Sequence, residues 1–208
     1  IRNIAGRLDD VKEGPRKKGV FTGIHILQSR VFEYLPPFVQ SCINAYCYPK
    51  MIANGETTKA VFLDGYWTDL GSLETFYMAN MMFLERKLSL SFFNPLDTYK
   101  LKPRQEDTEL VVLGENQELG NDIQIKPPVL IGHNVKIGAE AVIGPFVVIG
   151  DGSQIGKRAR LADSIVFPGV RLPNRAKVLG EVVNGNIRVP VPSSAGNTQI
   201  LKAVKKGP

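Results

Sequence analysis

Large apolar residues recur at every sixth position in the second half of the chain. The series is Ile131, Ile137, Ile143, Ile149, Ile155, Leu161 and Phe167. Glycine follows each of the first five, and a small or β-branched residue usually stands four positions after each one. A six-residue period fits neither an α-helix nor a simple strand, whose side chains repeat at about 3.6 and 2.0 residues. It is typical of a parallel β-helix, in which each hexad forms one flat side of a triangular coil.

The repeat also sets the expected size of this β-helix. Inward residues would stack on their equivalents in neighbouring coils, while the glycines let the backbone turn the corners. Seven hexads make little more than two coils, fewer than the roughly three stacked units that such a fold needs. We therefore expect a β-helix over residues 126–182, with a further imperfect coil through Val178-Leu179 or burial against another subunit. Residues 183–208 are expected to form a tail.

The first half of the chain alternates between β-rich and helical patterns. We expect a strand over 19–27, a helix from the N-cap Ser29 to Pro36-Pro37, a short helix ending at Asn54-Gly55, a strand over 59–63, an extended segment over 66–70 and a long helix from Gly71-Ser72 to near Leu88. Serine favours helix starts, whereas proline and glycine favour helix ends. This order predicts an α/β unit over residues 1–95. Residues 96–125 are rich in proline and charge, so a linker with one short strand at 110–113 is expected there.

Composition narrows the range of partners. The formal net charge is +6, but basic clusters such as Lys157, Arg158 and Arg160 are separated by acidic residues. Scattered clusters indicate a solvated surface rather than a nucleic-acid site. The sequence has no run of roughly 18 apolar residues and no signal-peptide pattern at its start, so we expect a cytoplasmic protein without a membrane partner. Cys42 and Cys47 have no second pair to complete a zinc site, which favours reduced core thiols.

Asp69 is the carboxylate that stands out from its surroundings. It lies at the end of an expected extended segment, close to Gly65 and Gly71 and ahead of a helix. Ligands gather at such strand ends in α/β folds, and Mg²⁺ takes one or two carboxylates together with substrate phosphates. The alternative is that Asp69 satisfies the amides of the turn near Gly71. The spacing alone leaves both interpretations open and slightly favours the turn.

Three stretches of the first half resemble the sugar-phosphate nucleotidyltransferases, which are also called nucleotide-sugar pyrophosphorylases. They are residues 20–27 with Pro36, residues 48–52, and residues 65–72 with Ala79-Asn80. A trailing left-handed β-helix is also common in that family, and the left hand of the coil is itself inferred from resemblance to hexapeptide-repeat proteins. The resemblance implies a Rossmann-like nucleotidyltransferase remnant followed by a left-handed parallel β-helix.

The resemblance also implies an activity and a set of site residues. The family joins a sugar 1-phosphate to a nucleoside triphosphate with Mg²⁺, giving an NDP-sugar and pyrophosphate. Asp69 matches the family's second magnesium-binding aspartate and would act in catalysis, and the Gly23 backbone matches the position that approaches the sugar. Thr22 stands where a small or amide residue is more usual, and Tyr66 with Trp67 would form the nearby wall.

The family's glycine-rich loop, its nucleotide-binding arginine and lysine, and its first metal aspartate have no counterpart in this sequence. We therefore expect the C-terminal part of a larger enzyme, inactive by itself. The sugar and the base stay open, with mannose 1-phosphate and GTP or glucose 1-phosphate and UTP or dTTP as the options.

Two other functions remain in view. Hexapeptide acyltransferases use a histidine as general base, and His133 is the histidine within the repeats, although a polar outward residue is expected at its position anyway. A non-catalytic scaffold or regulatory subunit is the other alternative. His25 would line the sugar pocket or occupy a partly exposed strand face. Exposed coil ends leave unpaired strand edges, so we expect the β-helix to form a homo-oligomer.

Overall fold

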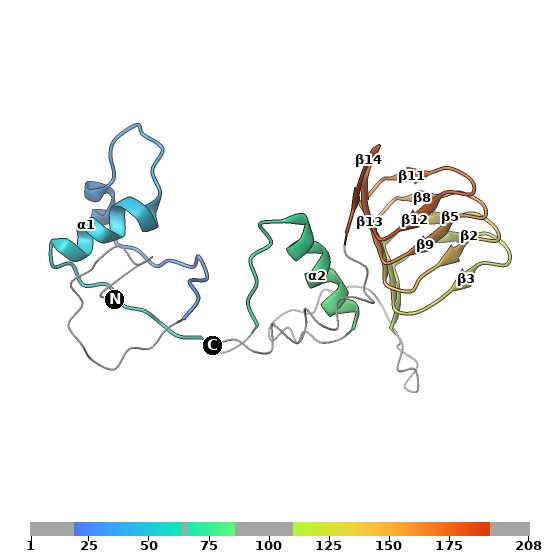
Figure 1. Cartoon of the computed structure of the whole chain (residues 1–208), viewed down its shortest axis with the longest axis horizontal. Helices are drawn as coiled ribbons and strands as arrows, with labels where there is room; N and C mark the ends of the chain where they lie inside the picture. The colour runs from blue at the N-terminus through green and yellow to red at the C-terminus, as the bar shows by residue number, and fades with distance from the viewer. Residues whose placement is uncertain (1–18, 64–65, 86–109, 192–208) are drawn as a thin grey trace. The chain divides into compact units, whose positions relative to one another are not determined.

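The computed structural model of the chain describes residues 19–63, 66–85 and 110–191, and the chain divides into two compact units, residues 1–67 and 68–208 (Figure 1). No helix within the described ranges is long and apolar enough to cross a membrane. Three expectations fall partly outside these ranges. They concern the start of the α/β unit (1–18), the region from the end of the long helix through most of the linker (86–109), and most of the tail (192–208).

Short helical elements build the first unit. They are the 3₁₀-helix η1 (Ser29–Tyr34), the π-helical turn η2 (Ile43–Cys47) and the α-helix α1 (Tyr48–Ala53). Val31 and Cys47 are buried, and the Cys47 thiol lies 3.8 Å from the Val31 carbonyl oxygen. The predicted stop at Asn54-Gly55 is confirmed, because α1 ends at Ala53 and Gly55 adopts a φ of 76°. Both cysteines are free thiols, but Cys42 is exposed rather than in the core.

The strands expected in the first unit are not formed. Residues 19–27 and 59–63 have no strand ladder, and the α/β architecture is not seen in the described residues of this unit. A strand requires a neighbour for its N–H and C=O groups, and the described residues supply none here. Apolar side chains on these segments are consequently left in solvent, with Ile26 99% and Val61 82% exposed. The expected N-cap Ser29 is also wrong, because Gln28 occupies the N-cap of η1 without a side-chain hydrogen bond.

In the second unit, residues 111–190 form a parallel β-helix of three sheets (Figure 1). The first sheet holds β1 (Val111–Leu113), β4 (Val129–Ile131), β7 (Val147–Ile149), β10 (Ser164–Val166) and β13 (Glu181–Asn184), with β14 (Ile187–Pro190) added antiparallel. The second sheet holds β2 (Glu118–Leu119), β5 (Lys136–Ile137), β8 (Gln154–Ile155) and β11 (Arg171–Leu172). The third sheet holds β3 (Gln124–Ile125), β6 (Val142–Ile143), β9 (Arg160–Ala162) and β12 (Lys177–Leu179). Because each coil gives one strand to each sheet, the four strands of the second and third sheets define four coils.

The buried series confirms the six-residue pattern from Ile131 to Leu161, all of whose members are at most 3% exposed. Strand partners are 18 residues apart in the early coils, as in Val129 and Val147, but 17 apart where Val147 pairs with Ser164. The corner before β10 is therefore one residue shorter. As a result Val166, and not the predicted Phe167, takes the inward place beside Ile149.

The β-helix is also longer than the sequence pattern predicted. Leu113, Leu119 and Ile125 pair with the first three isoleucines of the series, so residues 111–125 form a complete first coil. That coil lies where a linker was expected, and the short strand predicted at 110–113 is β1 within it. At the other end, β13 and β14 form a hairpin that extends into the range expected for the tail.

The helix α2 (Leu73–Leu84) begins where the sequence predicted, but it ends at Leu84 with Glu85 as its C-cap, before the predicted end near Leu88. The Ser72 hydroxyl accepts the backbone N–H of Thr75, and the Thr75 hydroxyl accepts the backbone N–H of Ser72, which forms a capping box. These two bonds satisfy amides that the first turn of a helix leaves without partners.

An apolar row on the outer face of the first sheet receives α2. The row consists of Val112, Leu130, Val148, Ile165 and Val182, which occupy equivalent places in successive coils. Tyr77, Met81 and Leu84 of α2 cluster with this row, and the ring of Phe76 lies 5.7 Å from that of Phe167. Burying a large apolar side chain contributes roughly 1.5–3 kcal/mol, so this contact fixes α2 on the β-helix.

Candidate functional site

The residues expected to contact the sugar lie in the first unit. Gly23 has a φ of 80°, and a Cβ added there would meet nothing within 4 Å, so the backbone conformation rather than a close neighbour favours glycine. Thr22 is half-buried beside it. Tyr66 and Trp67 are 47% and 43% exposed, which leaves part of each ring available for contact.

Asp69 belongs to the second unit, just before the capped start of α2. Its side chain is exposed, and its Oδ1 lies 3.3 Å from the position that a Cβ on Gly71 would take. No group of three or more His, Cys, Asp or Glu side chains that could hold a metal occurs within the described ranges. Within the described ranges Asp69 therefore offers a single carboxylate, which does not by itself make a metal site.

The two histidines have structural partners. His25 stacks on Tyr48 with ring centroids 5.6 Å apart, is hydrogen-bonded to its hydroxyl, and meets the edge of Phe21 at 4.9 Å. Burial raises the pKa of the Tyr48 hydroxyl.

His133 joins successive coils of the β-helix. Its Nδ1 accepts the backbone N–H of Glu115 at 2.9 Å, and its own backbone N–H donates to Asp151 Oδ1 at 2.7 Å. These bonds link His133 to the neighbouring coils, so its place in the β-helix is explained without a role in acyl transfer.

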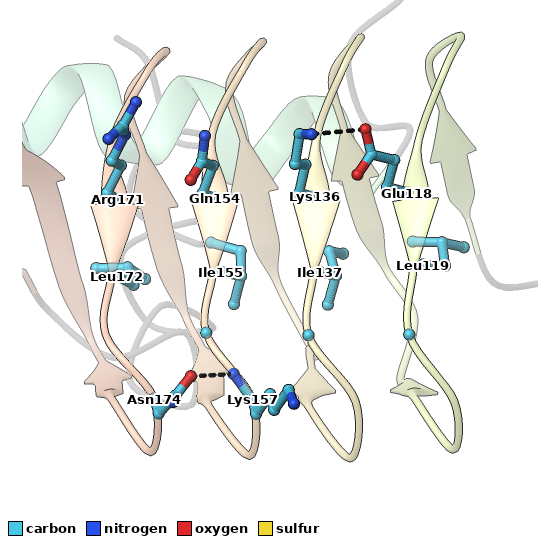
Figure 2. Close-up of a pocket in the computed structure, with 13 residues that line it drawn as sticks. Glu118, Leu119, Lys136, Ile137, Gln154, Ile155, Lys157, Arg171, Leu172 and Asn174 are labelled. Carbon is cyan, nitrogen blue, oxygen red and sulfur yellow. Dashed lines mark hydrogen bonds and ion pairs between the residues drawn. The ribbon is translucent and has the colours of Figure 1, made fainter.

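An open groove of about 490 Å³ crosses the outer face of the second sheet (Figure 2). One border is a row of outward side chains, namely Glu118, Lys136, Gln154 and Arg171. Lys157 and Asn174 form the other border, at the corner that leads to the third sheet.

Close packing of the coils keeps side chains out of the space between the two borders. In each of the first three coils, a glycine follows the inward residue of the second sheet: Gly120, Gly138 and Gly156. A Cβ on Gly138 would lie only 2.5 Å from the backbone nitrogen of Lys157 in the next coil. The corner itself is held by the Lys157 N–H, which donates to Asn174 Oδ1 at 2.8 Å (Figure 2).

A neighbouring hollow of about 540 Å³ shares Lys157 and Asn174 with the groove and is also lined by Glu140, Arg158 and Arg175. Two of the cations around the pair of hollows have carboxylate partners. Lys136 lies 2.6 Å from Glu118, and Arg158 binds Glu140 through two hydrogen bonds of 2.9 Å.

The charges around Glu140 reinforce one another. The hydrogen bond from Arg158 lowers the pKa of the Glu140 carboxyl, and the positive charges of Arg158, Arg175 and Lys157 add to the effect. Across residues 110–191, the side chains of Lys157, Arg171 and Arg175 form no ion pair. The hollows therefore carry an excess of positive charge.

A comparison with known protein families gives one match. Residues 125–201 match the family model described as the GMPPB C-terminal domain. Together with the fold, this match supports a C-terminal nucleotidyltransferase part with a β-helix. No curated protein matches the chain. The matched residues include Lys157, Arg171 and Asn174 of the groove, whereas Asp69 and Gly23 lie before the match.

The groove was not predicted from the sequence. A partial signal was present, because two residues of the outward row, Lys136 and Gln154, stand immediately before members of the hexad series, Ile137 and Ile155. The charge of this row is apparent only after each hexad has been assigned to one of the three sheets.

Proposed function

We propose that this chain is the C-terminal part of a sugar-1-phosphate nucleotidyltransferase, which joins a sugar 1-phosphate to a nucleoside triphosphate and releases pyrophosphate. The observation that carries the proposal is the match of residues 125–201 to the GMPPB C-terminal domain, on a chain that folds there as a parallel β-helix. The matched domain suggests a GDP-mannose pyrophosphorylase-like nucleotidyltransferase, so mannose 1-phosphate and GTP are the substrates that we propose first.

Asp69 is the proposed metal ligand and catalytic residue. Its exposed carboxylate fits the share of a Mg²⁺ site that one side chain can provide when substrate phosphates supply further oxygens. Bound Mg²⁺ neutralises charge on the reacting phosphates. Asp69 would hold its carboxylate toward those phosphates, while the Gly23 backbone, Thr22, Tyr66 and Trp67 would contact the sugar.

The exposed segments of the first unit support a larger catalytic domain. Residues 19–27 and 59–63 have the apolar pattern of strands, yet Val20 is 75%, Ile26 99% and Val61 82% exposed. Further strands of a nucleotidyltransferase domain would cover these side chains and pair with the backbone. We therefore propose that the 208-residue chain is inactive until that part of the domain is supplied.

We further propose that the β-helix forms a homo-oligomer. The first coil leaves the open edges of β1, β2 and β3 without a strand partner in the described residues, and Leu119 of that coil is 48% exposed. Parallel strand edges with an apolar rung are normally covered. Light scattering of the purified chain tests this, and a monomer at all concentrations would contradict it.

The activity is tested with the complete polypeptide that carries this sequence, by measuring pyrophosphate release from mannose 1-phosphate with GTP and from glucose 1-phosphate with UTP or dTTP. Asp69→Asn should lower kcat/KM by about a hundredfold or more, because a lost metal ligand removes several kcal/mol of transition-state stabilisation. Asp122→Asn is the matched control, since Asp122 is an exposed corner residue with a φ of 57° that asparagine adopts readily. Full activity of Asp69→Asn, or no activity with any pair of substrates, would instead support a scaffold or regulatory subunit.

A further inference from the structure

The cations that line the two hollows of the β-helix include three without a carboxylate partner. Lys157, Arg171 and Arg175 are exposed, and their side chains form no ion pair within residues 110–191. Two other cations of the hollows are paired, Lys136 with Glu118 and Arg158 with Glu140. The three cations without a carboxylate partner within residues 110–191 lie in the third and fourth coils.

Like charges are also stacked at the corner that the two hollows share. Arg158 and Arg175 occupy the same corner position in successive coils, each with a φ of 60°. Glu140 pairs with Arg158 but leaves Arg175 without an ion pair within residues 110–191. An anion bound at this corner would reduce the repulsion between the two arginines.

The shape of the groove limits the kind of anion. Its volume of about 490 Å³ falls within the range of roughly 300–1,000 Å³ that is usual for small-molecule sites. Cations stand on both borders, with Arg171 on one and Lys157 on the other (Figure 2). A ligand with two linked anionic groups can contact both borders, whereas a nucleic acid would need a longer track of cations than these coils offer.

We propose that this groove, together with the hollow beside it, binds a small molecule that carries a diphosphate group. Arg171 and Arg175 donate charge-assisted hydrogen bonds to the phosphate oxygens, as guanidinium groups do to phosphate in general. Lys157 adds a point charge at the shared corner, and Asn174 keeps that corner in place through its bond to the Lys157 N–H. The proposal does not depend on the proposed activity, because Asp69 is no part of this groove.

The test is isothermal titration calorimetry of the 208-residue chain with pyrophosphate and with a nucleoside diphosphate, at constant ionic strength. Arg171→Gln and Arg175→Gln should each weaken binding about tenfold, which is the contribution of one charge-assisted hydrogen bond. Lys126→Gln removes the same charge from an exposed position outside both hollows and should change affinity less than about twofold. Tighter binding of the nucleoside diphosphate than of pyrophosphate would identify a nucleotide as the ligand, and equal binding would identify the bare diphosphate group.

Thermal unfolding provides a second readout that a merely structural role would not produce. Arg175→Gln should leave the ligand-free Tm unchanged or raise it, because the variant loses a like-charged neighbour, while it reduces the rise in Tm caused by pyrophosphate. The proposal is overturned if pyrophosphate gives no saturable heat, or if Lys126→Gln weakens binding as much as the arginine variants do. It is also overturned if Asp69→Asn abolishes binding and the arginine variants keep it, a result that would favour the proposed active site. Displacement of pyrophosphate by a tighter-binding oligonucleotide would show a nucleic-acid surface instead.

Discussion

The hydroxyl of Tyr77 offers a sharp test of how α2 docks on the β-helix. Tyr77 is 0% exposed, and its hydroxyl has no hydrogen-bond partner among the described residues. Burial raises the pKa of this hydroxyl well above its ordinary value of 10.0, and the negative charge of Asp163 adds to the rise. The ring packs against the apolar row of the first sheet. The ring therefore stabilises the fold, whereas the buried hydroxyl oxygen destabilises it.

Removing only the oxygen should therefore stabilise the protein. A buried hydroxyl without a partner costs about 1–3 kcal/mol, so Tyr77→Phe should raise the free energy of unfolding by about 1 kcal/mol or more. Tyr77→Ala also removes the ring and should lower the free energy of unfolding by about 3–5 kcal/mol, as truncation of a buried aromatic residue does. The opposite signs of the two changes separate the oxygen from the ring.

The pH dependence adds an independent check. A raised pKa in the folded state means that the stabilisation is complete below pH 10 and is lost as pH rises from 10 toward the folded pKa, because the unfolded chain releases the proton first. Over that interval the wild type should lose about 1.4 kcal/mol per pH unit more than Tyr77→Phe does.

Urea unfolding followed by far-ultraviolet circular dichroism, at pH 8 and above pH 10, measures both quantities. Destabilisation by Tyr77→Phe at pH 8, or equal losses of stability for both proteins above pH 10, would refute the reasoning and show that the hydroxyl has a partner in solution.

Two further predictions concern the corners of the β-helix. Gly138→Ala should lower the free energy of unfolding by about 1–3 kcal/mol, since the new Cβ would meet the Lys157 backbone nitrogen at 2.5 Å. Gly152→Ala, where a Cβ meets nothing but φ is 67°, should cost only about 1 kcal/mol, and equal losses in urea unfolding would contradict the role of coil spacing. Arg158→Gln should raise the pKa of the Glu140 carboxyl, measured by NMR titration, because its two hydrogen bonds lower that pKa. Because the pKa of Glu140 is lowered in the folded state, its contribution to stability is present above the ordinary value of 4.5 and is lost as pH falls through the folded pKa. An unchanged Glu140 titration in the variant would count against the Arg158–Glu140 pair.

The six-residue period made the β-helix predictable, and the same period explains its missed ends. Leu113, Leu119 and Ile125 continue the series backwards without a break, but polar residues and prolines around them have the composition of a linker. The count fails at Phe167 because the corner residue Asp163, with a φ of 51°, turns the chain in one residue fewer. A deletion at a corner leaves no mark in composition, so only the strand register shows it.

In the first unit the local sequence pattern predicted strands that the structure does not contain. Residues 19–27 and 59–63 have a local pattern suited to strands, yet strand formation depends on a partner, which local sequence does not encode. The start of α2 was predictable because its capping box lies within Ser72 to Thr75. Its docking surface was not, because the apolar row that receives it is spread over residues 112–182 at intervals of 17 or 18.

The outward positions of the three sheets explain how one repeat yields three different surfaces. The inward positions of the coils are almost all apolar, with the buried Ser153 and Ser164 as exceptions, so the outward residues vary most freely. On the first sheet that residue is apolar in every coil, as at Leu130 and Ile165, and α2 covers it. On the second sheet the row changes from the Glu118–Lys136 ion pair to Arg171, which forms no ion pair within residues 110–191. Packing of the core does not require this change, because the inward residues beside Glu118 and Arg171 are both leucine, Leu119 and Leu172. The positive charge of the last coils therefore needs an explanation outside the fold, and binding of an anion provides one that can be measured.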